Sequence, residues 1–405
     1  MENTMPLQAP RGTNDILPDS QFQWNYFREA AELIASIHGY EKIDTPILEY
    51  HDVFSRAVGT STDVMEKETY TFTDRGGELI TLRPEGTAPV CRAFIEHGMH
   101  NLPQPVRLYY FCPVFRYERP QSGRYRQHHQ FGIEVLGSAE PEIDVEVIDL
   151  AWNILQRLGI SDIKLKINTM GDSDSRGIYV SKLQDYLKSK IDQMPETIKE
   201  RISSNPLRVL DSKDPKMFEI NNKAPRSIDY INSESSEHWA TLLKNLDTLS
   251  IPYEVDHKLV RGFDYYSRTV FEIVPSLEKS QNTLIGGGRY DGLIEMLGGK
   301  PTPGIGFGMG LERVVTAIGD TASDSESDIQ ILPPVINHPA FRDFYAFEQH
   351  VRAARKLRGL DMHPDWFKIA IFYFSNPNCC YGHGQKIPYP NKTTELDFEL
   401  EFAII

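Results

Sequence analysis

The stretch PVFRYERPQSGRYRQHHQFGIEVLG, residues 113–137, decides the fold class of this chain. It consists of two apolar, strand-like runs joined by a basic and polar loop. Side chains of a strand alternate between its two faces. If the two runs pair as a hairpin, Arg116, Gln130 and Glu134 lie on one surface. The stretch therefore predicts an antiparallel sheet that carries a charged site.

The flanking sequence extends this pattern into an α+β fold. Strand-like runs separated by turn residues occupy 68–74, 78–84, 106–118 and 128–138, and another covers 163–171. Apolar residues recur at helical spacing over 21–38 and 142–159. The segment 40–54 is rich in β-branched and apolar residues around Pro46, which predicts a strand at an edge or an interface. Residues 304–319 predict a helix entered through glycines, and the glycine run at 286–293 is by itself typical of a turn.

The composition changes twice along the chain. Residues 172–250 form polar, amphipathic helical segments without strands between them, which predicts a helical insertion between two parts of a core, 1–171 and 251–320. The Ser/Asp-rich residues 321–333 predict a linker. Residues 334–405 are aromatic- and proline-rich and end in a strand-like run, so we expect a truncated, β-rich tail.

The overall composition limits the classes of protein. The chain has 405 residues, 40% apolar and 25% charged, as in soluble globular proteins of two or three domains. No apolar run is long enough for a membrane span and the first residues do not form a signal peptide, so we expect a cytoplasmic protein. Four cysteines without a CxxC pair fit a reducing compartment.

Charge is the next constraint. A net charge of −14, from 43 basic and 57 acidic residues, argues against indiscriminate binding to polyanions. RNA is still a possible partner, because a polyanion needs only a local positive face. The hairpin supplies a dense basic run: Arg116, Arg119, Arg124, Arg126, His128 and His129.

The hairpin residues also indicate a type of chemistry. An arginine can hold a phosphate through two parallel hydrogen bonds, and a carboxylate on the facing strand can accept hydrogen bonds from a cationic substrate. The alternatives are a surface ion pair for Arg116 and Glu134 and a solvated turn for the loop between the strands. The residues of the hairpin alone leave both alternatives open.

Residues 115–134 resemble motif 2 of the class II aminoacyl-tRNA synthetases in the form typical of histidine–tRNA ligases, FRYERPQxGRYRQxHQxGxE, with every fixed position present. Four further stretches resemble the same family in the same order: TLRPEGTA at 81–88, RGFDYYSRTVFE at 261–272, GGGRYDGL at 286–293 and GIGFGMGLERVV at 304–315. The resemblance covers about residues 5–320 and implies the class II fold, an antiparallel sheet flanked by helices.

The resemblance implies roles for individual residues. Arg116 would hold the α-phosphate of ATP, Arg313 the γ-phosphate, and Arg261 would lie beside the histidine carboxylate and the α-phosphate. These three arginines are the implied catalytic residues. Glu134 and Tyr266 resemble the pair that binds the imidazole nitrogens. The full implied histidine-binding set is Glu85, Gly86, Thr87, Gln130, Glu134, Arg261, Tyr265, Tyr266 and Tyr290.

The same resemblance implies a reaction and its partners. Histidine would be activated by ATP, with Mg²⁺, to histidyl-adenylate and then transferred to the 3′ end of tRNA(His). Gln121 and Arg124 in the motif 2 loop would contact the tRNA acceptor end. The strand around Pro46 resembles motif 1, which implies a C2 homodimer.

The tail departs from this family. Histidine–tRNA ligases carry an anticodon-binding domain after the core, and we expect it to be missing here. From about residue 334 the chain resembles a fragment of a fumarylacetoacetate hydrolase-family domain, in which Glu399 and Glu401 would bind a divalent metal and His350 would act as a base. The remaining aspartate ligand of that family would lie downstream of these residues, so we expect a remnant without a working metal site.

Two other functions fit parts of the sequence. The regulatory subunit of ATP phosphoribosyltransferase resembles this core and does not charge tRNA. Such regulators usually lose the motif 2 and RGFDYY residues, whereas this chain has Arg116, Gln130, Glu134 and Arg261. A hydrolase acting through the tail would need the missing metal ligand. The sequence therefore favours the ligase.

Overall fold

The computed structural model describes residues 7–58, 64–118, 124–276, 283–323, 341–344 and 372–375. The chain divides into one unit of residues 1–322 and another of residues 323–405. In the second unit the described residues are two strands, β12 (Phe341–Phe344) and β13 (Phe372–Ser375), which pair antiparallel. The first unit contains the predicted core.

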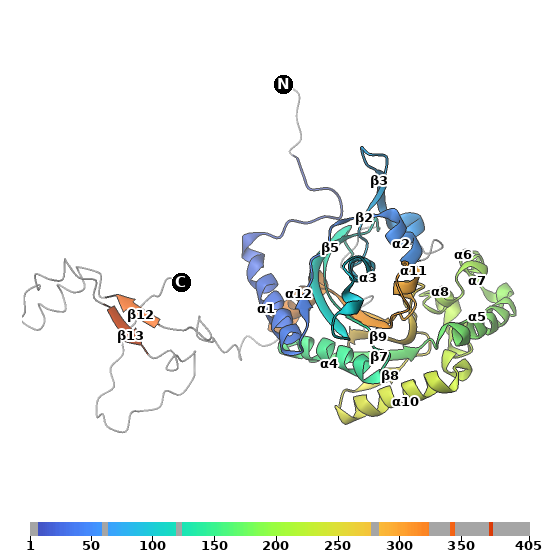
Figure 1. Cartoon of the computed structure of the whole chain (residues 1–405). Coiled ribbons are helices and arrows are strands. Elements are labelled where there is room, and N and C mark those ends of the chain that lie inside the picture. The colour runs from blue at the N-terminus through green and yellow to red at the C-terminus, as the bar shows by residue number, and fades with distance from the viewer. Residues whose placement is uncertain are drawn as a thin grey trace, which may run out of the picture. The chain divides into compact units, whose positions relative to one another are not determined.

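An eight-stranded sheet forms the centre of the first unit (Figure 1). Its strand order is β1-β5-β6-β11-β10-β9-β7-β8. All neighbours pair antiparallel except β1 with β5 and β7 with β8. The predicted α+β fold with a mainly antiparallel sheet is confirmed. The strands are β1 Glu41–Lys42, β5 Val106–Phe115, β6 Gln127–Leu136, β7 Ile163–Thr169, β8 Tyr253–Val255, β9 Ser267–Pro275, β10 Ile285–Arg289 and β11 Gly304–Gly310.

Four long helices pack in one hydrophobic cluster with the sheet: α1 (Gln21–Ile37), α4 (Pro141–Arg157), α10 (Ser233–Thr248) and α12 (Leu311–Ser323). Figure 1 shows α4 and α10 side by side beneath the sheet. The predicted helices over 21–38 and 142–159 are confirmed. Pro141 begins α4, and Glu142 and Asp144 place negative charge in its first turn, where the helix dipole favours it.

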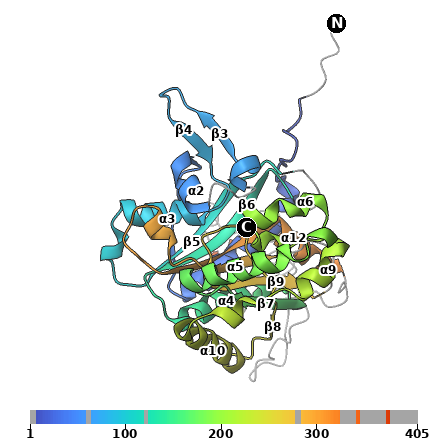
Figure 2. The same ribbon diagram turned by 90° about the vertical axis from the view of Figure 1, so that its right-hand side faces the viewer.

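A second hydrophobic cluster lies on the other face of the sheet. It joins α2 (His51–Val58), α3 (Thr87–Glu96) and α11 (Leu293–Met296) with the helices of residues 173–222. A small antiparallel sheet, in the order β2-β4-β3, projects from this part (Figure 2). Its strands are β2 Leu48–Tyr50, β3 Tyr70–Thr73 and β4 Leu79–Leu82, with the apolar side chains of Leu48, Tyr50, Phe72 and Leu79 exposed.

Residues 172–250 contain helices and no strand, as the sequence predicted. They are α5 Ser173–Lys188, α6 Glu196–Lys199, α7 Arg201–Ser204, α8 Leu207–Leu210, α9 Pro215–Asn222 and α10. The carboxylate of Asp172 accepts a 2.8 Å hydrogen bond from the Ser175 amide and so caps α5. Since α10 packs against α4, its apolar face belongs to the same core as the large sheet.

Two glycine-rich segments differ from the sequence expectation. Residues 304–310 form strand β11 and only Leu311 onward is helical, while Gly286 lies within strand β10 and not in a turn. A Cβ on Gly306 would lie 2.0 Å from Oε2 of Glu134, and one on Gly304 would lie 2.4 Å from the Tyr290 ring. Glycines at alternate positions therefore leave room for Glu134 of strand β6 and for Tyr290, which follows strand β10.

The segment 40–54 is also different from its prediction. In place of one strand it forms β1, β2 and the start of α2 at His51. Pro46 has no amide hydrogen for a strand ladder, which explains why the extended segment is interrupted there. None of the helices in the described part of the chain is long and apolar enough to cross a membrane.

Candidate functional site

A cavity of about 650 Å³ opens on the face of the sheet that carries the second hydrophobic cluster. It is lined by strands β6 and β9 to β11, by the 260–266 loop and by helices α7 and α8. Nine of the sequence-predicted residues meet here although they are distant in the chain: Glu85, Thr87, Arg116, Arg124, Gln130, Arg261, Tyr265, Tyr266 and Arg313.

Glu134 lies fully buried on β6 beneath this cavity. Its carboxylate accepts hydrogen bonds from the hydroxyls of Thr87, at 2.8 Å, Tyr110, at 3.1 Å, and Tyr290. Burial raises the pKa of Glu134 to about 8 even though these three hydroxyls favour the charged form. The carboxyl group is thus poised near neutral pH, and a ligand that donates a hydrogen bond or carries positive charge would favour its ionised form.

Glu85 supports the start of helix α3. Its two carboxylate oxygens accept hydrogen bonds from the amides of Thr87, at 2.7 Å, and Ala88, at 2.8 Å. Burial raises its pKa, although these amides and Arg116 favour the charged form. Gly86 between them is required sterically, because a Cβ there would lie 2.3 Å from the Tyr110 ring. The turn therefore holds Thr87 against Glu134.

Arg261 lies in the 260–266 loop and pairs with Glu272 of β9. Burial lowers the pKa of Arg261, but Glu272 together with Tyr266 and Tyr265 outweighs this and the net shift is upward. The guanidinium also lies 5.8 Å from the Tyr266 ring centre, and its buried Nε has no hydrogen-bond partner among the described residues. A buried donor without a partner is costly, so this atom points to a bound acceptor.

Two more arginines form a positive pole at the same cavity. Arg116 donates from Nε to the Pro84 carbonyl at 2.8 Å and lies 5.4 Å from the Phe263 ring centre. Arg313 donates from Nη1 to the Thr283 carbonyl at 2.9 Å, and burial together with Arg124 lowers its pKa. Arginine stays charged under such conditions. The arrangement suits a polyphosphate.

His128 has an environment that the sequence did not reveal. It belongs to the basic run of the hairpin, but burial, Arg116 and Arg313 lower its pKa to about 3, so it is neutral. His129, in contrast, contacts the carboxylate of Glu312 through its ring Nδ1, at 3.0 Å. The basic run of the hairpin therefore carries less positive charge than its composition predicts.

Aromatic rings form one wall of the site. The ring centres of Tyr265 and Tyr266 are 4.7 Å apart, and those of Tyr265 and Tyr290 are 5.8 Å apart. Tyr290 is almost fully buried, so it lies behind this wall and beside Glu134.

Sequence reasoning missed Tyr110, Glu272, Phe263 and His128 as members of the site. Phe263 and Glu272 lie inside the RGFDYYSRTVFE stretch and His128 inside the basic run, so each had a signal in the sequence. Tyr110 had one as well, because it faces Gly132 across the predicted hairpin and its ring fills the space that this glycine leaves.

Some predicted residues cannot be placed in the site. Gln121, Glu399, Glu401 and His350 lie outside the described residues.

Arg124 of the same loop is described: it lines the cavity and lies 3.3 Å from the Glu118 carboxylate. Among the cysteines, Cys91 and Cys112 are buried free thiols.

Known protein families and individual proteins are similar to this chain. A family model described as histidyl-tRNA synthetase matches residues 12–314, and one described as fumarylacetoacetate (FAA) hydrolase C-terminal matches residues 340–405. The chain is 49% identical to the histidine–tRNA ligase of Dehalococcoides mccartyi over 308 residues, 76% of this chain and 74% of that protein. It is 43% identical to the histidine–tRNA ligase of Desulfitobacterium hafniense over 360 residues, 88% of this chain and 85% of that protein.

Solved structures of related proteins have a similar fold. The crystal structure of apo S. aureus histidyl-tRNA synthetase matches with a TM-score of 0.64 and 36% identity, over 87% of this chain and 83% of that one. A Bacillus halodurans structure titled as an ATP phosphoribosyltransferase regulatory subunit/histidyl-tRNA synthetase matches with a TM-score of 0.58 and 22% identity, over 78% of this chain and 84% of that one, and supports the fold alone. On the family match over residues 12–314 and these relatives, the chain belongs to the histidyl-tRNA synthetase family.

Proposed function

We propose that this chain is a histidine–tRNA ligase that activates histidine with ATP and transfers the histidyl group to tRNA(His). The proposal rests on one cavity that is lined both by Arg116, Arg261 and Arg313 and by Thr87, whose hydroxyl donates to the buried carboxyl group of Glu134. A phosphate-binding pole beside a site for a donor-bearing side chain suits the adenylation of an amino acid. The retention of these residues also favours the ligase over a regulatory subunit.

Histidine would bind with its imidazole toward Glu134 and Tyr266, and its amino and carboxylate groups toward Glu85, Thr87, Gln130 and Arg261. The hydroxyls around Glu134 fix the orientation of its carboxyl group. An amino acid without ring nitrogens would leave these buried polar groups unpaired. Such a mismatch lowers kcat/KM by ~10⁴-fold or more.

Adenylation would proceed by in-line displacement. A histidine carboxylate oxygen attacks the α-phosphorus, a new O–P bond forms, and the bond from the α-phosphorus to the oxygen leading to the β-phosphate breaks to release pyrophosphate. Arg116 would hold the α-phosphate and Arg313 the γ-phosphate, while Arg261 would face the charge that develops between histidine and the α-phosphate. The three side chains supply position and charge rather than a covalent nucleophile.

Mg²⁺ would enter with ATP. Mg²⁺ usually binds one or two carboxylates together with substrate phosphates and water. Glu118 and Glu272 line the cavity beside the arginines and have the right donor atoms for this role. Mg²⁺ would supply further charge neutralisation on the phosphates when it is bound.

The second step would transfer the histidyl group to the terminal ribose of tRNA(His), with Gln121 and Arg124 contacting the acceptor end. The match to the synthetase family ends at residue 314, and the next family match is to the hydrolase model, at residues 340–405. We therefore expect weaker contacts to the anticodon and a larger loss in tRNA charging than in adenylation. We also propose a C2 homodimer through the small sheet and a cytoplasmic site of action, where tRNA and ATP meet.

Histidine-dependent ATP–pyrophosphate exchange by the full chain tests the proposal. We expect exchange with histidine, and a loss of about 10²- to 10³-fold in kcat for Arg261→Ala, since a fixed charge at the reacting centre is removed. Arg226→Ala is the matched control, because Arg226 pairs with Asp229 on the exposed surface. A folded chain that binds ATP without any histidine-dependent exchange would overturn the proposal.

A further inference from the structure

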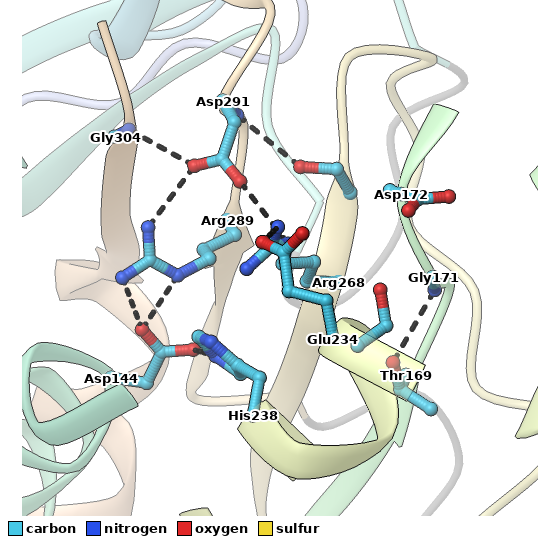
Figure 3. A network of polar contacts seen from close by, with 12 residues as sticks. Asp144, Thr169, Gly171, Asp172, Glu234, His238, Arg268, Arg289, Asp291 and Gly304 are labelled. Carbon is cyan, nitrogen blue, oxygen red and sulfur yellow. Dashed lines mark hydrogen bonds and ion pairs between the residues drawn. The ribbon is translucent and has the colours of Figure 1, made fainter. Parts of the chain in front are cut away.

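A buried ionic network lies on the face of the sheet that α4 and α10 cover, and Figure 3 shows its polar contacts. Arg289 of β10 and Asp144 of α4 are both fully buried. Nε of Arg289 lies 2.7 Å from Oδ1 of Asp144, and the other carboxylate oxygen lies 2.8 Å from Nε2 of His238 on α10. The network joins the sheet to two helices that are separate in the chain.

The remaining donors of Arg289 are also used. Nη1 donates to the Ser138 carbonyl and to Oδ1 of Asp291, both at 3.0 Å, and Nη2 donates to the Glu140 carbonyl at 3.1 Å. The same oxygen of Asp291 accepts the Gly304 amide at 3.3 Å. Burial alone would raise the pKa of Asp144, but Arg289 and the hydrogen bond from His238 lower it, so the aspartate is charged. The guanidinium is held in a single orientation by acceptors on several elements.

A second link to α10 runs through Arg268 of β9. Its side chain pairs with Glu234 in the first turn of α10 and lies 3.8 Å from Oδ2 of Asp291. The amide of Asp291 donates to the Ser267 hydroxyl at 3.2 Å. Figure 3 shows Arg268 between Glu234 and Asp291. Helix α10 is thus connected to residues on both sides of Tyr290.

Tyr290 is the residue between these two anchors. Side chains alternate along an extended chain, so Arg289 points toward the helices while Tyr290 points toward Glu134, to which it donates a hydrogen bond. The pairing of β10 with β9 shifts its register between Gly288 and Arg289. Such irregularities redirect side chains next to functional sites. The backbone of Tyr290 is further held by a 2.8 Å hydrogen bond from its amide to the Gly304 carbonyl.

We propose that the Arg289–Asp144–His238 network positions Tyr290 against Glu134, so that helix α10 sets the geometry of the histidine pocket without touching the substrate. The part of this inference that concerns histidine rests on the function proposed above. Removing one member of a buried charged group leaves the others without compensation, and the surrounding structure then rearranges. His238, Asp144 and Arg289 are therefore positioning residues, and small displacements at such a site have large kinetic effects.

The test compares two His238 variants with a control on the same helix. His238→Leu removes the donor to Asp144, and His238→Gln keeps an N–H that can replace it. Leu246→Ala loosens the buried apolar face of α10 two turns away and leaves the network intact. We expect His238→Leu to raise the histidine KM by about 10- to 100-fold with little change in the ATP KM, His238→Gln to restore most of the affinity, and Leu246→Ala to leave the histidine KM near the wild-type value.

A readout that does not require activity separates this inference from the proposed function. Fluorine NMR of 3-fluorotyrosine placed at position 290 reports the environment of that ring, and Glu134→Gln identifies the shift that accompanies loss of its partner. We expect His238→Leu to move the resonance in the same sense, and Leu246→Ala to leave it in place. An unmoved resonance in folded His238→Leu overturns the positioning role, whereas a moved resonance in a chain without histidine-dependent exchange supports it and rejects only the proposed function. Equal KM changes in His238→Leu and Leu246→Ala would also overturn it.

Discussion

The hydroxyl of Thr87, at the first residue of helix α3, donates a 2.8 Å hydrogen bond to Glu134 on strand β6. The amide of Thr87 at the same time donates to Glu85. One residue therefore connects two buried carboxyl groups that the proposed function assigns to different parts of histidine. Loss of the Thr87 hydroxyl should therefore weaken histidine binding.

Replacing Thr87 with valine keeps the shape of the side chain and removes its hydroxyl. The hydroxyl stabilises the ionised form of Glu134, which bound histidine would favour. A lost hydrogen bond to a buried charged group costs about 1.5–3 kcal/mol, so we expect a rise of roughly 10- to 100-fold in the histidine KM of pyrophosphate exchange. Thr248→Val on the exposed end of α10 is the control, since its hydroxyl donates to the Lys244 carbonyl of the same helix. An unchanged histidine KM in Thr87→Val would show that this hydroxyl does not orient Glu134.

The raised pKa of Glu134 predicts a pH dependence of stability. Its folded pKa is about 8 and its ordinary value is 4.5, so the folded state holds a proton that the unfolded state releases between these pH values. The contribution of Glu134 to the free energy of unfolding is complete below pH 4.5 and is lost as the pH rises through 8. Glu134→Gln cannot ionise, so its urea midpoint should fall less than that of the wild type between pH 5 and pH 8. Parallel pH profiles for the two proteins would contradict the raised pKa.

Gly306 lies where any side chain would clash with its neighbours in the site. A Cβ there would lie 2.0 Å from Glu134 and 2.2 Å from the Ile133 carbonyl, which is backbone and cannot move aside. We expect Gly306→Ala to destabilise the chain by about 1–3 kcal/mol, as overpacked cores do, and to abolish histidine binding measured by calorimetry.

Gly177→Ala is the matched control for that substitution. Gly177 lies within helix α5, and a Cβ there would meet nothing within 4 Å. Alanine is favoured over glycine in a helix interior, so this variant should gain about 1 kcal/mol of stability with normal histidine binding. Equal thermal midpoints for the two alanine variants would refute the steric explanation.

Arg116→Lys tests the role of the arginine fork. Lysine keeps the charge but cannot hold a phosphate through two parallel hydrogen bonds and cannot donate from Nε to the Pro84 carbonyl. We expect the ATP KM to rise about tenfold or more while the histidine KM changes little. Arg226→Lys on the surface is the control. A larger effect on the histidine KM than on the ATP KM would place Arg116 elsewhere in the site.

The sequence predicted most of the fold because local patterns specified it. The hairpin of β5 and β6 forms with the expected alternation, and α1 and α4 end within two residues of their predicted limits. The glycine segments were misjudged for a physical reason. Positions 304 and 306 of the strand are glycine because the side chains of Tyr290 and Glu134 occupy the space that a Cβ would need, and that requirement comes from other parts of the chain.

The sequence by itself determined the antiparallel sheet, the helices around it and the set of polar residues in the synthetase motifs. Only the tertiary structure decided the protonation state of these residues and which of them contact one another. Glu134 is poised near neutral pH because it is buried among groups from distant segments, and His128 is neutral because it is partly buried beside Arg116 and Arg313. The contact of His238 with Asp144 spans 94 residues, and that of Asp144 with Arg289 spans 145. Burial and charge pairing depend on which segments meet in space, and that information is not contained in any local stretch of sequence.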